Sequence, residues 1–230
     1  MARKRWIFAG HAAGFAACVA ALPLGWVAPL FVPDEVPELT YHGTVWNGTL
    51  TDIPVFDTAN FDLHPLSLSA DIEAGDGTNY VSATVNRHQA RDARVVVDLS
   101  TLPLTDQRLQ GLVGSVAANL ILLGYGPEGC TEAEGTVRTD VLQRNGGNMN
   151  WTGPELSGPI TCETGDLVAI LKGEDSEQSI DALLRFSADS TYRVDITART
   201  SRAEAGTILP LFGFSSTGRD FKLTEQGKWR

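Results

Sequence analysis

The residues of this chain best suited to chemistry begin with its cysteines. Cys130 and Cys162 are the two cysteines outside a long apolar run near the N-terminus. They form no C-x-x-C pair and no histidine lies between them, so the spacing of a zinc or redox site is missing. In an oxidising compartment they would pair, closing a loop of about 33 residues and adding about 3–4 kcal/mol of stability on the chain-entropy model. We therefore predict a structural disulfide.

The four histidines and a glycine-rich segment are the remaining candidates. His11, His42, His64 and His88 are never two or four residues apart, so their spacing does not indicate a metal site. The segment 124–129 matches G-x-G-x-x-G, but it carries a proline and opens no helix, so we interpret it as chance. G-x-S-x-G and H-E-x-x-H are absent from the sequence. We therefore predict no catalytic, cofactor-binding or metal-binding site, and an exported enzyme is the least favoured interpretation.

The charges disfavour nucleic acid and are unevenly placed. The chain has 28 Asp+Glu against 18 Lys+Arg, a formal net charge of -10 at pH 7. Acidic proteins repel phosphate, so we expect no nucleic-acid partner. Residues 6–32 contain no charged side chain, and Arg3, Lys4 and Arg5 precede them. The remaining residues, 33–230, carry a net charge of -13.

The uncharged run of residues 6–32 is long enough to cross a bilayer, which needs about 20 apolar residues. Since positive clusters stay in the cytoplasm, we predict a cytoplasmic tip at 1–5, a transmembrane anchor at 6–32 and an exported domain at 33–230. Two alternatives remain, a signal-peptidase site at Val19-Ala20-Ala21 and a poor lipoprotein box ending at Cys18. All three routes export the domain.

The exported part alternates polar and apolar residues, as half-buried strands do. The clearest runs are 66–73, 93–99 and 192–199. Weaker candidates are 44–50, 55–63, 80–86, 135–142, 158–163, 166–172, 180–187 and 219–225. Short strands at this spacing predict a mainly β domain, an antiparallel curved sheet or meander, with a partly open barrel as the alternative.

One segment departs from this alternation. Apolar residues between Leu109 and Ile121 recur at intervals of three and four, and Gly124 follows as a stop. This spacing predicts an amphipathic helix over 106–123, whose apolar stripe would cover the hydrophobic face of the sheet. A membrane-surface or partner-binding helix is the alternative, but the polar side lacks the basic residues that lipid headgroups attract.

Two further motifs carry a family resemblance. The first comprises Gly43, Thr44, Val45, Trp46 and Gly48, and the second, which the two cysteines frame, comprises Trp151, Gly153, Pro154, Leu156 and Gly158. Together with the basic tip, the apolar run and a C-terminal hairpin at 218–227, they make the chain resemble the type II secretion system protein N family. That resemblance implies a bitopic inner-membrane protein of Gram-negative bacteria with a mainly β periplasmic domain. It implies no catalytic residues.

The resemblance also implies a function. We expect a non-enzymatic accessory component of the type II secretion system that supports protein export across the outer membrane. Its expected partners are other secretion components in the inner membrane and periplasm. The negative charge of the exported domain would favour partners with basic surfaces. The alternative is an envelope lipid-handling domain with an apolar groove, although an ordinary packed core explains the same residues. The groove would be lined by Leu66, Leu68, Ile72, Val95, Val97, Val194 and Ile196.

Overall fold

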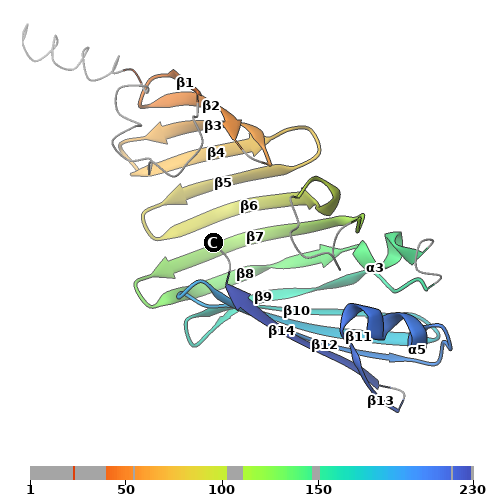
Figure 1. The fold of residues 1–230 in the computed structure, drawn as a ribbon. Helices are drawn as coiled ribbons and strands as arrows, with labels where there is room; N and C mark the ends of the chain where they lie inside the picture. The colour runs from red at the N-terminus through yellow and green to blue at the C-terminus, as the bar shows by residue number, and fades with distance from the viewer. Residues whose placement is uncertain are drawn as a thin grey trace, which may run out of the picture.

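The computed structural model describes residues 23, 40–53, 55–102, 111–146, 151–218 and 220–228. They form one 14-stranded antiparallel sheet in which the strands follow chain order, apart from a final exchange that places β13 at the edge beyond β14. Figure 1 shows the strands stacked one beside another and curling at the C-terminal end. The predicted antiparallel meander is confirmed, as an open sheet rather than a closed barrel.

The strands are 3 to 12 residues long and most are joined by short turns. In chain order they are β1 (Thr40–Gly43), β2 (Asn47–Ile53), β3 (Asp57–His64), β4 (Ser69–Gly75), β5 (Tyr80–Asn86), β6 (Gln89–Asp98), β7 (Ser115–Gly126), β8 (Gly129–Thr139), β9 (Leu156–Glu163), β10 (Asp166–Glu174), β11 (Gln178–Phe186), β12 (Thr191–Thr200), β13 (Ser215–Thr217) and β14 (Asp220–Lys228). The helical elements described are η2 (Leu99–Thr101), α3 (Val141–Arg144), α5 (Ala205–Ile208) and η3 (Leu209–Phe212).

The register gives the sheet one apolar and one polar face, because paired residues on neighbouring strands point to the same side. One continuous row of paired and mainly apolar residues crosses nine strands: Tyr41, Leu50, Ala59, Ala74, Val81, Val95, Ala118, Val137 and Gly158. The residues between them point the other way and are mostly polar, as in the pairs Glu73↔Ser82 and Arg94↔Asn119. The alternation of the sequence therefore produces two chemically distinct faces.

The prediction of a helix over 106–123 was wrong. Ser115–Gly126 is β7, paired with β6 and β8, and residues 103–110 lie outside the described part. A β-bulge between Leu120 and Leu122 adds one residue to the strand, which turns the usual two-residue interval into three. Combined with an apolar run that fills both faces, the bulge imitates a helical period.

Most of the other predicted strands overlap the observed ones, with some shifts. The run at 44–50 covers the β1–β2 turn and the first part of β2, and the run at 135–142 extends past the end of β8 into α3. The run at 66–73 becomes β4, which starts at Ser69, so Leu66 and Leu68 lie in the preceding turn. The predicted anchor at 6–32 lies outside the described residues, apart from Pro23, which forms an isolated bridge with Thr44. Among the residues that the structure describes, no helix is both long and apolar enough to span a membrane.

Candidate functional site

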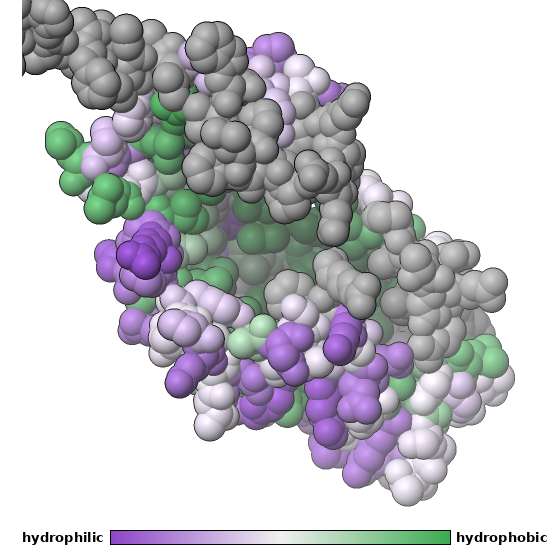
Figure 2. Space-filling view, turned by 60° about the vertical axis from the view of Figure 1, so that its left-hand side comes forward, coloured by the Kyte–Doolittle hydropathy of each residue, from purple (hydrophilic) through white to green (hydrophobic). Residues whose placement is uncertain are grey.

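The apolar face of β3–β7 is the most extensive candidate binding surface, and we call it the open face. Its inward side chains include Phe61, Ile72, Val81, Val85, Val95 and Val97, all of them half-buried. The inward residues of β3–β6 that reach full burial are alanines, namely Ala59, Ala70, Ala74 and Ala93. Figure 2 shows hydrophobic residues lining a hollow in the middle of the molecule, with hydrophilic residues along its lower rim.

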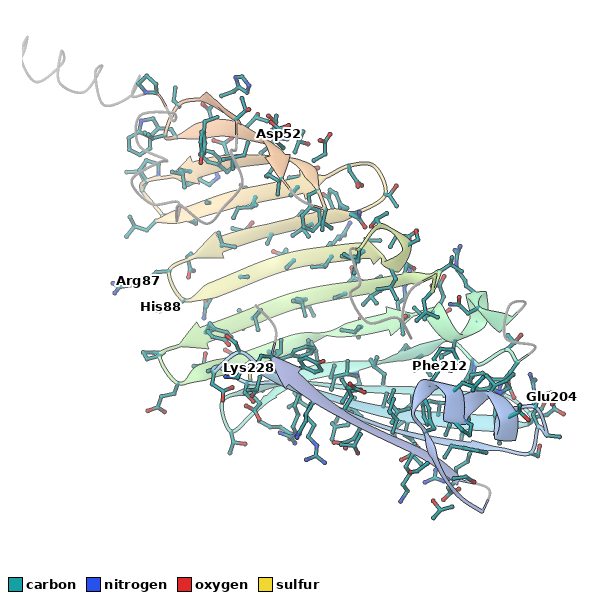
Figure 3. All side chains as sticks on the ribbon, viewed as in Figure 1. Asp52, Arg87, His88, Glu204, Phe212 and Lys228 are labelled. Carbon is teal, nitrogen blue, oxygen red and sulfur yellow. A yellow bond between two sulfur atoms is a disulfide. The ribbon has the colours of Figure 1, made fainter. Side chains whose placement is uncertain are left out.

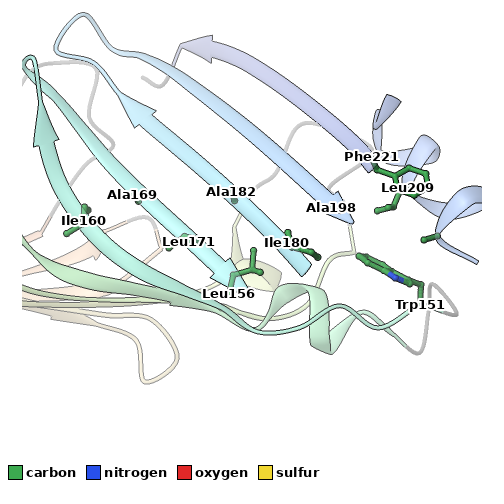
Figure 4. Close-up of a cluster of buried hydrophobic side chains, with 11 residues drawn as sticks. Trp151, Leu156, Ile160, Ala169, Leu171, Ile180, Ala182, Ala198, Leu209 and Phe221 are labelled. Carbon is green, nitrogen blue, oxygen red and sulfur yellow. The ribbon is translucent and has the colours of Figure 1, made fainter. Parts of the chain in front are cut away.

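The same face is partly covered over β9–β14. There α5 and η3 pack on the strands, and Leu209 joins Leu171, Ile180 and Phe221 in one buried cluster. Figure 4 shows these side chains converging from strands and helical turn, with Trp151 at the end of the cluster. The cover that sequence analysis assigned to residues 106–123 is therefore supplied, over the C-terminal strands, by a segment for which no helix was predicted.

The second sequence motif closes one end of this core. The Trp151 side chain is 4 % exposed, and its indole N–H donates a hydrogen bond of 3.0 Å to Oε1 of Gln178. A Cβ at Gly158 would lie 1.8 Å from the carbonyl oxygen of Ile170, so only glycine permits this close approach of β9 and β10. Pro154 is half-buried, and Gly153 and Leu156 are buried beside the tryptophan. The motif is placed to support packing.

The first motif forms the turn between β1 and β2. Gly43 has a φ of 94°, and a Cβ there would lie 2.6 Å from the carbonyl oxygen of Asn47. The Thr44 hydroxyl donates to Oδ1 of Asn47 over 3.0 Å, and the carbonyl oxygen of Trp46 accepts a hydrogen bond from Leu63 N–H. Val45 is half-buried, and Gly48 pairs with Gly43 across the hairpin. The first motif lies at the β1–β2 end of the sheet and the second lies at β9 and just before it, so the two do not form one site.

The predicted disulfide is present between Cys130 and Cys162, whose Cα atoms are 5.6 Å apart. Cys130 lies at the start of β8, and its N–H donates to the carbonyl oxygen of Gly165 in the β9–β10 turn over 2.8 Å. The bridge therefore ties the β7–β8 hairpin to the beginning of the covered region. Its position at a junction of hairpins supports a structural role.

Sequence analysis missed three buried amides, Asn79 before β5, Asn145 at the end of α3 and Gln178 at the start of β11. Asn79 is completely buried, and its side chain bonds to Val55 O, Asp76, Thr101 and the N–H of Asp98 over 2.8–3.1 Å. Asn145 and Gln178 make similar contacts near β7 and β11. Nothing in the local sequence shows that these amides point inward.

The polar face holds a shallow hollow of about 420 Å³ lined by Asn60, Asp71, Glu73 and Thr84 among others. The Thr84 hydroxyl donates to Asp71 over 2.7 Å, and this bond, followed by that from His64, lowers the pKa of the Asp71 carboxyl. Within the described residues no group of three or more His, Cys, Asp and Glu side chains is arranged to hold a metal ion. His42, His64 and His88 are exposed on separate elements, and His11 lies outside the described residues.

Comparison with known proteins gives one match. The model of a family described as "Type II secretion system (T2SS), protein N" matches residues 40–224, which is most of the chain. Searches of curated proteins and of solved structures found no match.

Proposed function

The chain belongs to the type II secretion system protein N family, and from this membership we propose that it is a non-enzymatic accessory component of that system. Residues 6–32 would hold it in the bacterial inner membrane as a single-pass protein, with the β-domain in the periplasm. There it would contact other secretion components and support protein export across the outer membrane. The observation that carries the proposal is the family match over residues 40–224.

The shape of the domain supports a scaffold role. With about 4.8 Å between neighbouring strands, 14 strands make a stack about 60 Å long before curvature shortens it. Such a stack can hold contacts well away from the membrane in which it is anchored. Its ends are the edge strands β1 and β13, where an extended segment of a partner can add a strand.

A deletion strain tests the proposal. Loss of the chain should reduce the amount of type II substrates in the culture medium and leave them in the periplasm, and the wild-type gene should restore export. Crosslinking the tagged full-length protein in membranes should recover inner-membrane or periplasmic secretion components. Normal export of every substrate in the deletion strain would contradict the accessory role.

The open face favours a second candidate, the handling of envelope lipid in an apolar groove. Of the residues first assigned to such a groove, Ile72, Val95, Val97, Val194 and Ile196 do share the apolar face by register. Leu66 and Leu68 instead lie in an exposed turn. A half-buried row of valines and alanines supports acyl-chain binding, since apolar clefts take up such chains by burying their surface.

Two neighbouring valines provide a matched test of lipid binding. Val95 lies on the open face, while Val96, 36 % exposed, lies on the polar face. If the groove holds lipid, native mass spectrometry of the purified wild type and of Val96→Glu should show co-purified lipid, and Val95→Glu should show far less. Absence of lipid from the wild type, or equal amounts in the two variants, would count against this candidate.

A further inference from the structure

The turn between β3 and β4 exposes two leucines at its tip. Leu66 is 102 % exposed and Leu68 is 80 % exposed, and no other large apolar side chain among the described residues reaches the exposure of these two. Leu68 also has a φ of 51°, a left-handed conformation in which turns usually place glycine, asparagine or aspartate. A leucine held outward at such a position indicates that the apolar side chain itself is needed there.

The turns on the same side of the sheet share a distinctive chemistry. Because the strands are antiparallel, alternate turns lie along one side, and for β1–β6 these are 43–47, 64–69 and 86–89. We call them the leucine edge. It contains no carboxylate, and it presents the exposed side chains of Arg87 and His88 beside the leucines. Figure 3 shows Arg87 and His88 on this side and Asp52 on the opposite one.

The opposite side of the same strands is acidic. Its described residues include Asp52 near the end of β2, Asp57 at the start of β3, Asp76 between β4 and β5, and Asp98 at the end of β6. The two ends of the strands therefore differ in both polarity and charge. Apolar side chains next to cations favour the interface of an anionic bilayer, whereas carboxylates are repelled by it.

The covalent distance to the predicted anchor permits this orientation. Seven residues, which make eight steps from one Cα atom to the next, lie between Val32, the end of the apolar run, and Thr40 at the start of β1. Even fully extended they span at most about 28 Å. The strands β1–β6 stack over only about 25 Å. An anchored chain therefore keeps the leucine edge within reach of the membrane surface.

We propose that the leucine edge rests on the phospholipid surface of the membrane that holds the anchor, with Leu66 and Leu68 inserted among the headgroups. The inference builds on the anchored arrangement in the proposed function and adds an orientation to it. The acidic turns then point away from the bilayer. The open face would stand at an angle to the membrane surface instead of lying flat on it.

Fluorescence of the full-length protein in vesicles tests the contact. The protein is reconstituted into phosphatidylethanolamine–phosphatidylglycerol vesicles, and an environment-sensitive dye is attached to Leu66→Cys in a Cys18→Ser background. The control is Leu211→Cys, another exposed leucine, 72 % exposed, in η3. Both side chains are exposed, so labelling should leave the fold intact.

The expected result is a blue-shifted emission at position 66 and several-fold stronger quenching by headgroup-level spin-labelled lipid than at position 211. Equal quenching at the two positions, in protein that floats with the vesicles, overturns the membrane contact and leaves the proposed function standing. Protein that does not float with the vesicles overturns the contact and the anchored arrangement together.

Discussion

The two halves of the sheet share one topology but are stabilised differently. In β1–β7 the apolar face buries only small alanines completely, whereas in β8–β14 it buries Trp151, Leu171, Ile180 and Phe221. The difference follows from cover, since α5 and η3 pack on the C-terminal strands. An apolar face alone therefore does not make a core, because a second layer is needed to remove its side chains from water.

Buried and bonded amides occur in both halves, Asn79 in the N-terminal half and Gln178 in the C-terminal half. Asn79 connects the loop after β2, the turn before β5 and the end of β6 through one completely buried amide. A buried polar group that is fully bonded fixes geometry without adding much apolar burial. Such bonds help the open half to keep its shape with less apolar burial.

The largest expected effect separates the halves with one type of substitution. Phe221→Ala removes a side chain that is 6 % exposed and should lower the free energy of unfolding by about 4 kcal/mol. Phe61→Ala removes a half-buried ring from the open half and should cost about 2 kcal/mol. Urea denaturation of the full chain in detergent, followed by circular dichroism, measures both.

The two phenylalanine variants can also contradict the difference between the open and covered halves. Equal losses for the two variants would mean that Phe61 is as well covered as Phe221. The open face would then be an ordinary core, and the lipid-handling candidate would lose its structural support.

The disulfide should have the next largest effect. Replacing Cys130 and Cys162 together by serine should lower the stability by about 3 kcal/mol, because the unfolded chain gains the entropy of an open loop. Hydrogen exchange should rise first at the ends of β8 and β9, which the bridge joins. Adding a reductant to the double variant should change nothing. A uniform rise over β2–β5 as well would indicate that the two halves unfold as one unit.

The sequence predicted features that depend on neighbouring residues and missed features that depend on contacts with distant ones. Alternation along Tyr192–Ala198 identified β12, and the disulfide followed from cysteine counting and export. The error at β7 came from a bulge, whose extra residue at Ile121 depends on the pairing partner and not on local sequence. The cover by α5 was missed for a related reason, since a four-residue helix such as Ala205–Ile208 is too short to show a period.

The candidate site was predicted only in part. The register confirms that Val95 and Ile196 share one face, but the exposure of Leu66 depended on where β4 begins, a boundary that alternation alone does not define. The inward turn of Asn79 was equally hidden, because a polar residue in a turn is normally solvated.

The amide of Asn79 offers a third test of the comparison. Asn79→Ala leaves the N–H of Asp98 and the carbonyl oxygen of Val55 without their partner and should cost about 2 kcal/mol. Asn119→Ala, on the exposed polar face of β7, should cost less than about 0.5 kcal/mol. Urea denaturation of the two variants provides the measurement. A negligible loss for Asn79→Ala would contradict the view that hydrogen bonds hold the open half together.

The smallest expected effect is a pH dependence in the open half. Hydrogen bonds from Thr84 and then His64 lower the pKa of Asp71 below its ordinary value of 3.8. On acidification the unfolded chain takes up this proton first, so the stabilisation is complete above about pH 5 and is lost as the pH falls through the lower folded pKa. Asp71→Asn should therefore be less stable than wild type near neutral pH, and the difference should shrink on acidification. Glu73→Gln, two residues along the same face, is the control. Urea unfolding midpoints of both variants, measured across this pH range, test the expectation. An equal response of the two variants would show that the bond from Thr84 contributes nothing to stability.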